Sequence, residues 1–507
     1  MVTDAHTCDL LIVGGGINGA GIARDAAGRG LKVMLVEQND LASATSSWST
    51  KLIHGGLRYL EHFEFRLVRE SLGEREVLLR AAPHLVAPLS FVLPHEPHLR
   101  PAWMIRTGLF LYDHLRQRES LPASFPVRLE RSHWGAGLDP RFKRGFVYAD
   151  ARVDDSRLVI ANVLAAHALG AKVAVRCRFK GAQRVGALWN CDTVDAQGHR
   201  EQITARAIVN AAGPWVKHVR DTVNASPARE NVRHVKGSHI VVPRVHGEEH
   251  AYILQNADKR IIFVIPYQER FSLIGTTDIA VDEYEHPEIS KQEIEYLLGI
   301  ANSYLARALT PADIVWSFSG VRPLYDDGAA DPSAITRDYV LKLDTGSGRH
   351  AAPALSIYGG KLTTYRKLAE HALAELQPYF SGMKGRWTDS ASLPGGDIPH
   401  ADFAAFVGEL TQRYAYLPGD VVRGIARRHG CRALDVLSDV RRSEDLGRNF
   451  GESLTAVEID YLIREEWART GEDVLWRRTK AGVGMTPGQR NAVMAFVERT
   501  VAQASPA

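Results

Sequence analysis

Three glycines near the start of the sequence, Gly14, Gly16 and Gly19, have the spacing G-x-G-x-x-G. They lie between an apolar run, residues 10–13, and a run of helix-forming residues that extends through Ala27. In that context the first glycine permits a tight turn, the second lets the backbone approach a ligand, and the third lets the helix pack close to the strand. Free N–H groups at the positive end of such a helix bind phosphate oxygens, so the pattern predicts a dinucleotide site.

An acidic residue at the end of the next apolar run completes this pattern. Residues 33–36 read as a second strand and lead into Glu37, whose carboxylate can accept hydrogen bonds from both hydroxyls of a ribose. We therefore expect a free 2′-hydroxyl rather than a 2′-phosphate, with Gly15 and Asn18 also in contact with the cofactor. NAD and FAD share this fingerprint, so the choice between them stays open here. A glycine-rich turn in another α/β protein is the structural alternative.

A second junction between glycines and a helix lies far along the chain. The apolar run ALSIY leads into Gly359 and Gly360, followed by Lys361, Leu362 and Thr363 at the head of a helix-forming run. Positive charge there would stabilise the negative charge that builds on a reduced flavin. A flavin ring needs a cradle of its own, so this junction favours FAD over NAD, with residues 360–363 as cofactor contacts.

Small and hydroxyl-bearing residues after two of the expected strands extend the candidate cofactor site. Residues 43–50 are mainly Ser and Thr, which suit a wall beside phosphates or a flavin; a flexible loop is the alternative. After the apolar run 207–209, small residues let the backbone touch a cofactor that lies across the sheet edge. The further cofactor candidates are Thr45, Ser46, Ser47, Lys51, His54, Gly55, Gly56, Leu57, Ala212 and Gly213.

Composition excludes several classes of protein. The 507 residues carry a net charge of only +3, so we expect no nucleic-acid partner. The four cysteines are scattered and not clustered with histidine, which argues against a disulfide framework, a zinc site or an iron–sulfur cluster, and no metal is expected. The start, MVTDAHT, lacks the regions of a signal peptide, and no long apolar run occurs. We expect a protein of the cytosolic side, soluble or peripheral.

The order of the apolar runs predicts an α/β fold with more than one domain. The two glycine junctions belong to a Rossmann-like parallel sheet, and residues 231–278 alternate in a way typical of a mostly antiparallel sheet inserted beside it. The Pro/Gly-rich stretch from Leu393 is the best candidate linker, and helical periodicity without strand patterns follows it. We therefore expect an FAD-binding domain interleaved with a substrate-binding sheet over 1–395, and an all-helical domain over 396–507.

A helix rich in aromatic residues is expected over residues 103–112. It carries Trp103 and Phe110 between flanking arginines at 100, 106 and 116. Such a face suits a membrane interface. A core helix whose arginines reach out to water is the alternative, and the sequence alone favours this core helix.

Several segments in order resemble one known family. VGGGINGAGIARDAAGRG and GGKLTTYRKLA look like the two signatures of FAD-dependent glycerol-3-phosphate dehydrogenase. The bacterial aerobic enzymes are matched by SSWSTKLIHGGLRYLEHFEFRLVRE, RPAWMIRTGLFLYDHL, KGSHIVVPR, GTTD and SGVRPL…ITRDY. The resemblance covers essentially the whole chain. It implies a peripheral enzyme on the cytosolic face of the inner membrane that oxidises sn-glycerol 3-phosphate to dihydroxyacetone phosphate and passes electrons through FAD to a quinone.

Alternatives to this activity stay open at this point. Oxidases that resemble the family use O2 and usually carry an extra insertion; no obvious extra segment occurs here, which favours the dehydrogenase. A related flavin amine or amino-acid oxidase shares the fold, and a flavin-binding module for recognition or scaffolding is a third class. The electron acceptor and a homodimeric state are left open.

A phosphorylated substrate would need cationic partners and a base. Arginine binds a phosphate dianion in bidentate fashion, and Arg58, Arg322 and Arg337 lie beside glycines or strand ends; structural salt bridges are the alternative. The resemblance implies substrate contacts at Arg322 and Lys361, and we expect Tyr59 to join them. As hydride leaves the substrate carbon, its hydroxyl must lose a proton. The base is left open between residues 54 and 239, both histidines, with Lys361 as an electrostatic partner. The catalytic candidates are His54, His239, Arg322 and Lys361.

Overall fold

The computed structural model describes most of the chain. The described residues are 7–96, 100–223, 231–256, 258, 260–326, 338–346 and 351–504, without the side chains of Arg58, His62 and Ala504. The predicted phosphate contact Arg337 therefore lies outside the described residues, and so does the side chain of Arg58.

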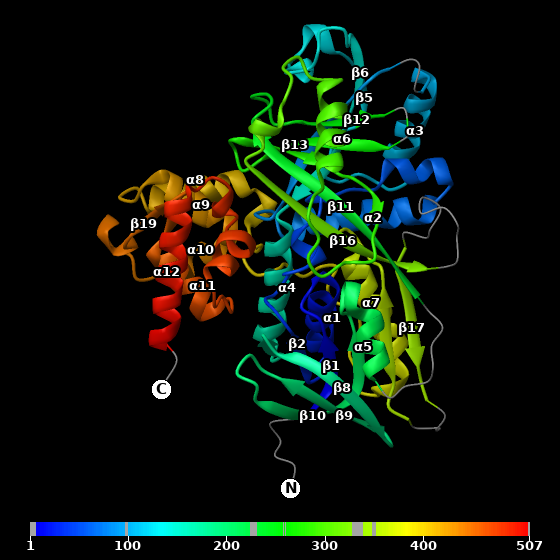
Figure 1. Ribbon diagram of the computed structural model, residues 1–507, viewed down its shortest axis with the longest axis vertical. Helices are drawn as coiled ribbons and strands as arrows, with labels where there is room; N and C mark the ends of the chain where they lie inside the picture. Colours follow the sequence, from blue (N-terminus) through cyan, green and yellow to red (C-terminus); the bar gives the residue numbers. More distant parts are fainter. Residues whose placement is uncertain are drawn as a thin grey trace.

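A mostly parallel sheet forms the centre of the dinucleotide domain (Figure 1). Across the sheet its strands are β17 (Val340–Asp344), β18 (Ala354–Tyr358), β10 (Arg200–Asn210), β1 (Thr7–Val13), β2 (Val33–Glu37) and β7 (Lys172–Val175). All neighbours are parallel except β17, and a hairpin of β8 (Arg178–Val185) and β9 (Leu188–Val194) adds to β10. The Rossmann-like fold is confirmed, with β1 at the centre and the glycine turn at its carboxyl end.

Three helices cover one face of this sheet: α1 (Ile17–Gly28), α4 (Asp155–Ala168) and α7 (Tyr365–Leu376). Alternate residues of β1 separate the two faces, because Leu10 and Ile12 join the core under these helices while Leu11 and Val13 join the core under the β8–β9 hairpin. Helices α1 and α7 approach closely at Gly21, where a Cβ would lie 2.6 Å from the ring of Tyr365. Close packing of this kind brings both glycine junctions to one edge of the sheet.

A second, mostly antiparallel sheet lies above the first (Figure 1). Its main path is β15 (Ile279–Ala280), β11 (Asn231–Pro243), β14 (Phe271–Gly275), β13 (Ile261–Tyr267), β12 (Ala251–Gln255), β4 (Val86–Pro94), β6 (Arg144–Val153) and β3 (Leu52–Ile53). Strands β16 (Trp316–Asp326) and β5 (Phe125–Arg128) pair with β11 and β6. The expected inserted sheet is confirmed, although it also takes strands from residues 52–153, which the sequence analysis had not placed in it.

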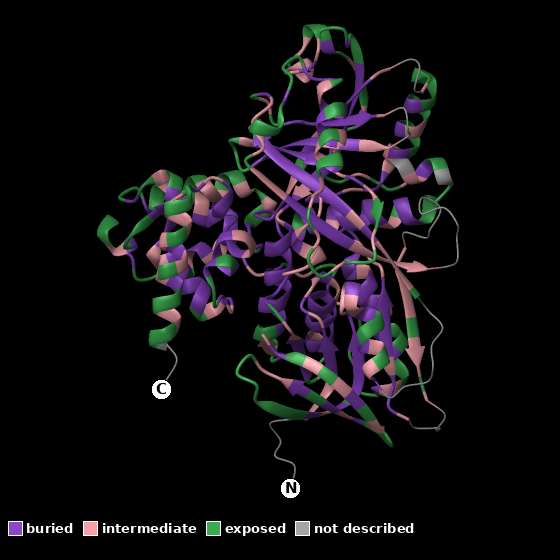
Figure 2. Cartoon of the chain, in the orientation of Figure 1, coloured by how far each residue is buried: buried purple, intermediate pink, exposed green. Residues whose placement is uncertain are grey.

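Helices cover both faces of the second sheet. One face packs against α6 (Lys291–Asn302), and the other packs against α2 (Phe65–Ala81) and α3 (Ala102–His114). Figure 2 shows the buried strands between these helices. The site described below lies where strands of this sheet meet the edge of the parallel sheet.

Helix α3 packs on the core with one face only. Ile105 and Tyr112 are buried, whereas Trp103 and Phe110 are 68% and 58% exposed. The expected core helix is therefore wrong for half of its surface, and the exposed face has the aromatic composition that suits a membrane interface. None of the described helices combines the length and apolar character that crossing a bilayer requires.

The C-terminal part forms a helical domain beside the two sheets (Figure 1). Its elements are α8 (Phe403–Arg413), α9 (Gly419–His429), α10 (Ala433–Val436), β19 (Asn449–Gly451), β20 (Leu454–Thr455), α11 (Ala456–Glu465), a π-helical segment (Asp473–Arg478) and α12 (Pro487–Ala504). These elements share a hydrophobic core of their own. The helical domain is confirmed, but the β19–β20 hairpin makes "all-helical" wrong in detail, and the boundary at 395/396 stays a prediction.

Candidate active site

The turn between β1 and α1 needs two of its glycines for its own packing. Gly14 has a φ of +114°, and a Cβ there would lie 2.5 Å from the carbonyl oxygen of Ala211. At Gly19 a Cβ would lie 1.9 Å from the carbonyl oxygen of Gly14. At Gly16, by contrast, a Cβ would meet only the hydroxyl of Ser46, at 3.1 Å. The turn therefore leaves room at Gly16 for a ligand that approaches the start of α1.

Backbone donors at this turn hold the predicted ribose-binding carboxylate. The N–H groups of Gly15 and Asn39 donate to the two oxygens of Glu37, at 2.7 and 2.8 Å. Burial raises the pKa of this carboxyl, and the same two backbone donors oppose the rise. Since each carboxylate oxygen accepts more than one hydrogen bond, Glu37 keeps acceptor capacity for ribose hydroxyls. Ser46 also belongs to this end of the site, because its Oγ accepts from the N–H of Ile17 at 3.0 Å.

The two glycine junctions meet in space. The side-chain amide of Asn18 donates to the carbonyl oxygen of Gly359 at 3.1 Å, across 341 positions in sequence. A Cβ at Gly360 would lie 2.9 Å from the same amide nitrogen, and both glycines have positive φ. The side-chain oxygen of Asn18 is buried and has no hydrogen-bond partner among the described residues. The junctions therefore form one continuous site with an acceptor still unsatisfied.

Three side chains of the polar loop bind other parts of the protein. Thr45 donates to the carbonyl of Val321 at 2.6 Å, and Ser47 donates to the carbonyl of Ala42 at 2.7 Å. The ammonium of Lys51 pairs with Asp155 at 2.8 Å. These bonds make the loop a fixed wall, so the alternative of a flexible loop is wrong, and the hydroxyl of Ser47 and the ammonium of Lys51 are engaged within the protein.

The next segment, residues 54–57, lies against the second junction. The N–H of His54 donates to the hydroxyl of Thr363 at 3.3 Å, and the N–H of Gly55 donates to the hydroxyl of Tyr112 at 2.8 Å. Gly56 has a φ of +77°, and the turn there leads into Leu57. The structure thus brings this part of the predicted cofactor set beside residues 360–363.

The end of β10 adds a third side to the site. Gly213 has a φ of +55°, and a Cβ there would meet no described atom within 4 Å. The preceding residue, Ala212, is held by the side chain of Asn210, whose oxygen accepts its N–H at 3.3 Å. Open space beside a fixed backbone is what a cofactor lying across this edge requires.

Lys361 carries the most informative charge in the site. Its ammonium nitrogen is buried, has no hydrogen-bond partner among the described residues and lies 4.0 Å from the centre of the Tyr59 ring. A buried ammonium without a partner is costly unless a ligand supplies the missing acceptor. An anionic or electron-rich ligand fits beside it, as the reacting end of a flavin or a substrate oxygen would.

His239 and Arg322 form a second group on strands β11 and β16. The imidazole Nε2 of His239 lies 3.0 Å from the hydroxyl of Thr50, and its ring stacks on Phe318 at 4.8 Å. The guanidinium of Arg322 donates to the carbonyl of Thr277 at 3.3 Å. Burial, together with nearby cations that include Arg322, lowers the pKa of His239 to about 3. This imidazole is therefore neutral at pH 7, and its lowered pKa makes it a weaker base than a free imidazole.

His54 has the same protonation state for a related reason. Burial lowers its pKa, the carboxylate of Asp150 opposes the shift, and the cation of Lys361 adds to it. Both candidate bases are thus neutral imidazoles, and the choice between them stays open.

Two contacts of the site were missed in the sequence. Thr50, which orients His239, is one of several hydroxyl-bearing residues of a polar run, and nothing in the sequence singles it out. Asp278, which lies 3.2 Å from the guanidinium of Arg322, belongs to the GTTD segment. That segment was the available signal, since a carboxylate forms a strong charge-assisted pair with arginine.

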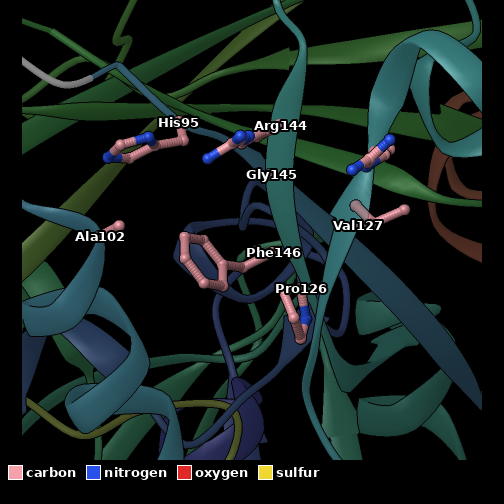
Figure 3. A pocket seen from close by; sticks show the side chains of 8 residues that line it. His95, Ala102, Pro126, Val127, Arg144, Gly145 and Phe146 are labelled. Atoms are coloured by element: carbon pink, nitrogen blue, oxygen red, sulfur yellow. The ribbon is translucent and has the colours of Figure 1, made fainter.

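A cavity of about 440 Å³ lies apart from this site, between β5, β6 and the start of α3. None of the predicted site residues is among those that line it. Figure 3 shows the side chains of His95 and Arg144 on one side of the cavity, near the ring of Phe146. Its neighbour α3 is the helix with the exposed aromatic face, so the cavity belongs to that region rather than to the cofactor edge.

The comparisons with known proteins agree with this geometry. Residues 9–366 match the family described as FAD dependent oxidoreductase, and residues 386–503 match the C-terminal domain of alpha-glycerophosphate oxidase. The chain is 52% identical over 491 residues to a glycerol-3-phosphate dehydrogenase of Pseudomonas aeruginosa, with 96% of this chain and 94% of the relative covered. It is 49% identical over 499 residues to a D-erythritol 1-phosphate dehydrogenase of Brucella abortus, with 98% of each covered.

A solved structure shows the same fold. The glycerol-3-phosphate dehydrogenase of Bacillus halodurans, complexed with FAD, gives a TM-score of 0.74 at 26% identity, with 99% of this chain and 95% of that chain covered. The chain therefore belongs to the FAD-dependent oxidoreductases. The residues present fit FAD, because room at Gly16 and Gly213 coincides with the unsatisfied polar groups of Asn18 and Lys361.

Proposed function

We propose that the protein oxidises sn-glycerol 3-phosphate to dihydroxyacetone phosphate. The observation that carries the proposal is the buried ammonium of Lys361 at the second glycine junction, which has no hydrogen-bond partner among the described residues. It supplies positive charge where a substrate oxygen and the reacting end of a flavin would meet. The names of full-length relatives point to a polyol phosphate as the substrate.

Each polar group of the site has a role in this reaction. FAD, when bound, accepts the hydride that leaves the secondary carbon of the substrate. A neutral imidazole, His54 or His239, takes the proton from the hydroxyl on that carbon, and Lys361 stabilises the oxygen as its negative charge grows. Arg322 binds the phosphate through its guanidinium N–H groups. Arg58 and Arg337 stay predicted phosphate contacts, and Tyr59 a predicted substrate contact.

D-erythritol 1-phosphate is the second candidate substrate. The relative with that activity in its name is 49% identical over nearly the whole chain, almost as similar as the glycerol-3-phosphate dehydrogenase. Both substrates have a terminal phosphate and a secondary hydroxyl on the neighbouring carbon, and the tetritol is longer by one carbon. A site that binds phosphate and polarises a hydroxyl could accept either substrate. Which one is preferred therefore depends on the length of polyol that the site accommodates.

The electrons go to a quinone at a membrane surface in this proposal. The exposed aromatic face of α3, with Trp103 and Phe110, supports peripheral attachment to a membrane. The cytosolic face of the inner membrane stays the predicted location. The C-terminal match to a glycerophosphate oxidase keeps O2 as the alternative acceptor. A homodimer stays a prediction.

Anaerobic spectral titration of the purified holoenzyme tests the proposal. Glycerol 3-phosphate should bleach the flavin absorbance, and a quinone analogue should restore it. D-erythritol 1-phosphate and glycine are titrated in parallel. Faster bleaching by the tetritol phosphate would make it the substrate, bleaching by glycine would indicate an amino-acid oxidase, and a spectrum that no compound changes would leave only a flavin-binding module. If peroxide formed in air as fast as substrate is oxidised, the electron acceptor would be O2 and not a quinone.

A further inference from the structure

The C-terminal domain contacts the nucleotide-binding segment through a buried ion pair. Arg478, at the end of the π-helical segment, donates to both carboxylate oxygens of Asp40, each at 2.8 Å. Arg478 is fully buried and Asp40 nearly so. The neighbouring Arg477 donates to the same carboxylate at 2.5 Å. A bidentate, buried pair of this kind fixes both partners in position.

Asp40 lies in the loop that closes over the glycine turn. Two residues further on, the N–H of Ala42 donates to the carbonyl of Gly15 at 3.0 Å. The side chain of Leu41 packs so closely on the turn that a Cβ at Gly15 would lie 2.9 Å from it. The position of Asp40 therefore sets how the loop after Glu37 lies on the dinucleotide turn.

The same stretch of the C-terminal domain reaches the other end of this segment. Lys480 donates to the hydroxyl of Ser156 at 2.6 Å and lies 3.3 Å from one oxygen of Asp155. The other oxygen of Asp155 accepts from the hydroxyl of Ser49 and from the ammonium of Lys51, both at 2.8 Å. Residues 478 and 480 thus hold the segment 38–51 at its start and, through Asp155, at its end.

We propose that the C-terminal domain is a clamp that positions residues 38–51 and thereby sets the affinity for FAD. Between the two clamped ends lies Ser46, whose hydroxyl accepts from the first N–H of α1, so displacement of the segment disturbs the phosphate-binding end of that helix. Arg478 and Lys480 are positioning residues, since they act through Asp40 and Asp155. The inference requires FAD as the cofactor but does not depend on which polyol phosphate is oxidised.

The test compares FAD affinity of full-length variants after removal of the flavin. Arg478→Lys keeps the positive charge but loses the bidentate contact, and Arg477 still pairs with Asp40, so the fold has a partner for its buried carboxylate. Asp40→Asn keeps the shape of the side chain and removes its charge. Arg428→Lys is the matched control, because the side chain of Arg428, 10% exposed, forms a bidentate pair with the buried Glu458 and both residues belong to the C-terminal domain.

Quenching of flavin fluorescence on binding gives the dissociation constant of each variant. We expect FAD to bind at least about 10-fold more weakly to Arg478→Lys and Asp40→Asn, and within about twofold of wild type to Arg428→Lys. Turnover at saturating FAD should return to the wild-type value, which a damaged active site would not do. Unchanged FAD affinity in either folded variant, or equal weakening in the control, would overturn the clamp.

Hydrogen exchange of backbone amides tests the clamp in the wild-type protein, without any substitution. In flavin-free wild type the amide of Ala42 should be protected as strongly as amides of β1, because the clamp holds its bond to Gly15 in the absence of the cofactor. Rapid exchange at Ala42 before FAD is added would show that the cofactor, rather than the C-terminal domain, orders the segment.

Discussion

The ammonium of Lys361 lies over the ring of Tyr59, 4.0 Å from its centre, and this contact is the main stabilisation the buried cation receives from the described protein. A cation–π contact offsets only part of the cost of burying an ammonium. The protein thus meets this cost when it folds, before any ligand binds. The charge is then already in place when a substrate oxygen arrives.

Lys361→Met should separate stability from activity. Because the ammonium lacks a hydrogen-bond partner in the described structure, its removal should leave the flavin-free protein as stable as wild type or raise its free energy of unfolding by about 1 kcal/mol. The rate of flavin reduction by substrate should fall by at least about 100-fold. Thermal unfolding and anaerobic stopped-flow measure the two effects.

Lys51→Met is the matched control for this prediction. Lys51 is also buried, but it pairs with Asp155, so its loss should lower the free energy of unfolding by roughly 3 kcal/mol. If both variants lost the same stability, Lys361 would have a stabilising partner and the assignment of its charge to a ligand would fail.

Gly16→Val should abolish FAD binding without unfolding the protein. A Cβ at this position meets only the hydroxyl of Ser46, so the added methyl groups project into the space left for the pyrophosphate. The purified variant should be colourless, with a circular dichroism spectrum like that of wild type. Gly247→Val is the control, since a Cβ there meets no described atom within 4 Å and the protein should stay yellow. A yellow Gly16→Val variant would refute the placement of the phosphates.

Arg322→Ala should weaken substrate binding while FAD stays bound. Loss of a charge-assisted contact to a phosphate costs about 1.5–3 kcal/mol, so KM should rise about 10- to 100-fold. Arg322→Lys should recover part of the loss because it keeps the charge but not the fork of N–H donors. Steady-state kinetics and the flavin content of each variant test this prediction. Loss of FAD from Arg322→Ala would show that Arg322 contacts the cofactor instead of the substrate.

Stability should fall as the pH falls from 6.5 towards 5. Burial, followed by nearby cations, lowers the pKa of both His239 and His84 to about 3, whereas an imidazole in the unfolded chain takes up its proton near pH 6.5. Between these values the unfolded state binds more protons, so protonation favours unfolding. Buried carboxylates such as Asp155 and Glu458, with pKa values lowered to about 2, contribute only below about pH 4.5.

Thermal unfolding at a series of pH values checks this expectation. The midpoint should fall between pH 7 and pH 5, and His84→Asn should make the fall shallower because one depressed imidazole is removed. A midpoint that stays constant over this range would show that these imidazoles titrate alike in the folded and unfolded states.

The exposed face of α3 should determine attachment to lipid. Phe110→Gln removes one exposed aromatic side chain and should reduce binding to vesicles of anionic phospholipid by about 3- to 10-fold. Val185→Gln, at the equally exposed turn of the β8–β9 hairpin, is the control and should change nothing. Co-sedimentation with vesicles measures both. Equal binding by all three proteins would remove α3 from the membrane contact.

The local parts of the site were predictable from the sequence. The glycine turn, Glu37 and the Gly359–Gly360 junction each belong to one strand and the helix or strand beside it, and hydrophobic period and glycine spacing determine such units within about 30 residues. The prediction that the two glycine junctions bind one cofactor rests on the chemistry of a flavin, whose ring needs a binding site separate from that of the pyrophosphate. The contact that joins them, from Asn18 to Gly359, depends on packing between distant helices and is visible only in the structure.

The contacts that the sequence does not show have the same origin. Ser47 and Lys51 look free in a polar stretch, but their partners, Ala42 and Asp155, are chosen by the fold. Strands β4 and β6 escaped assignment to the second sheet because strand pairing across more than 50 residues leaves no local pattern. The exposure of one face of α3 is not predictable from the sequence for a related reason, since apolar periodicity shows that an apolar face exists but not whether another element covers it.

The central place of β1 in its sheet has a consequence for protein synthesis. Both of its neighbours follow it in the chain, β2 at once and β10 much later. At 5–20 residues per second, the ribosome needs roughly 10–40 s to add the about 190 residues between the end of β1 and the start of β10. During that time the edge of the apolar strand β1 that will pair with β10 remains unpaired. The nascent chain should therefore need a chaperone most while its first 200 or so residues are emerging.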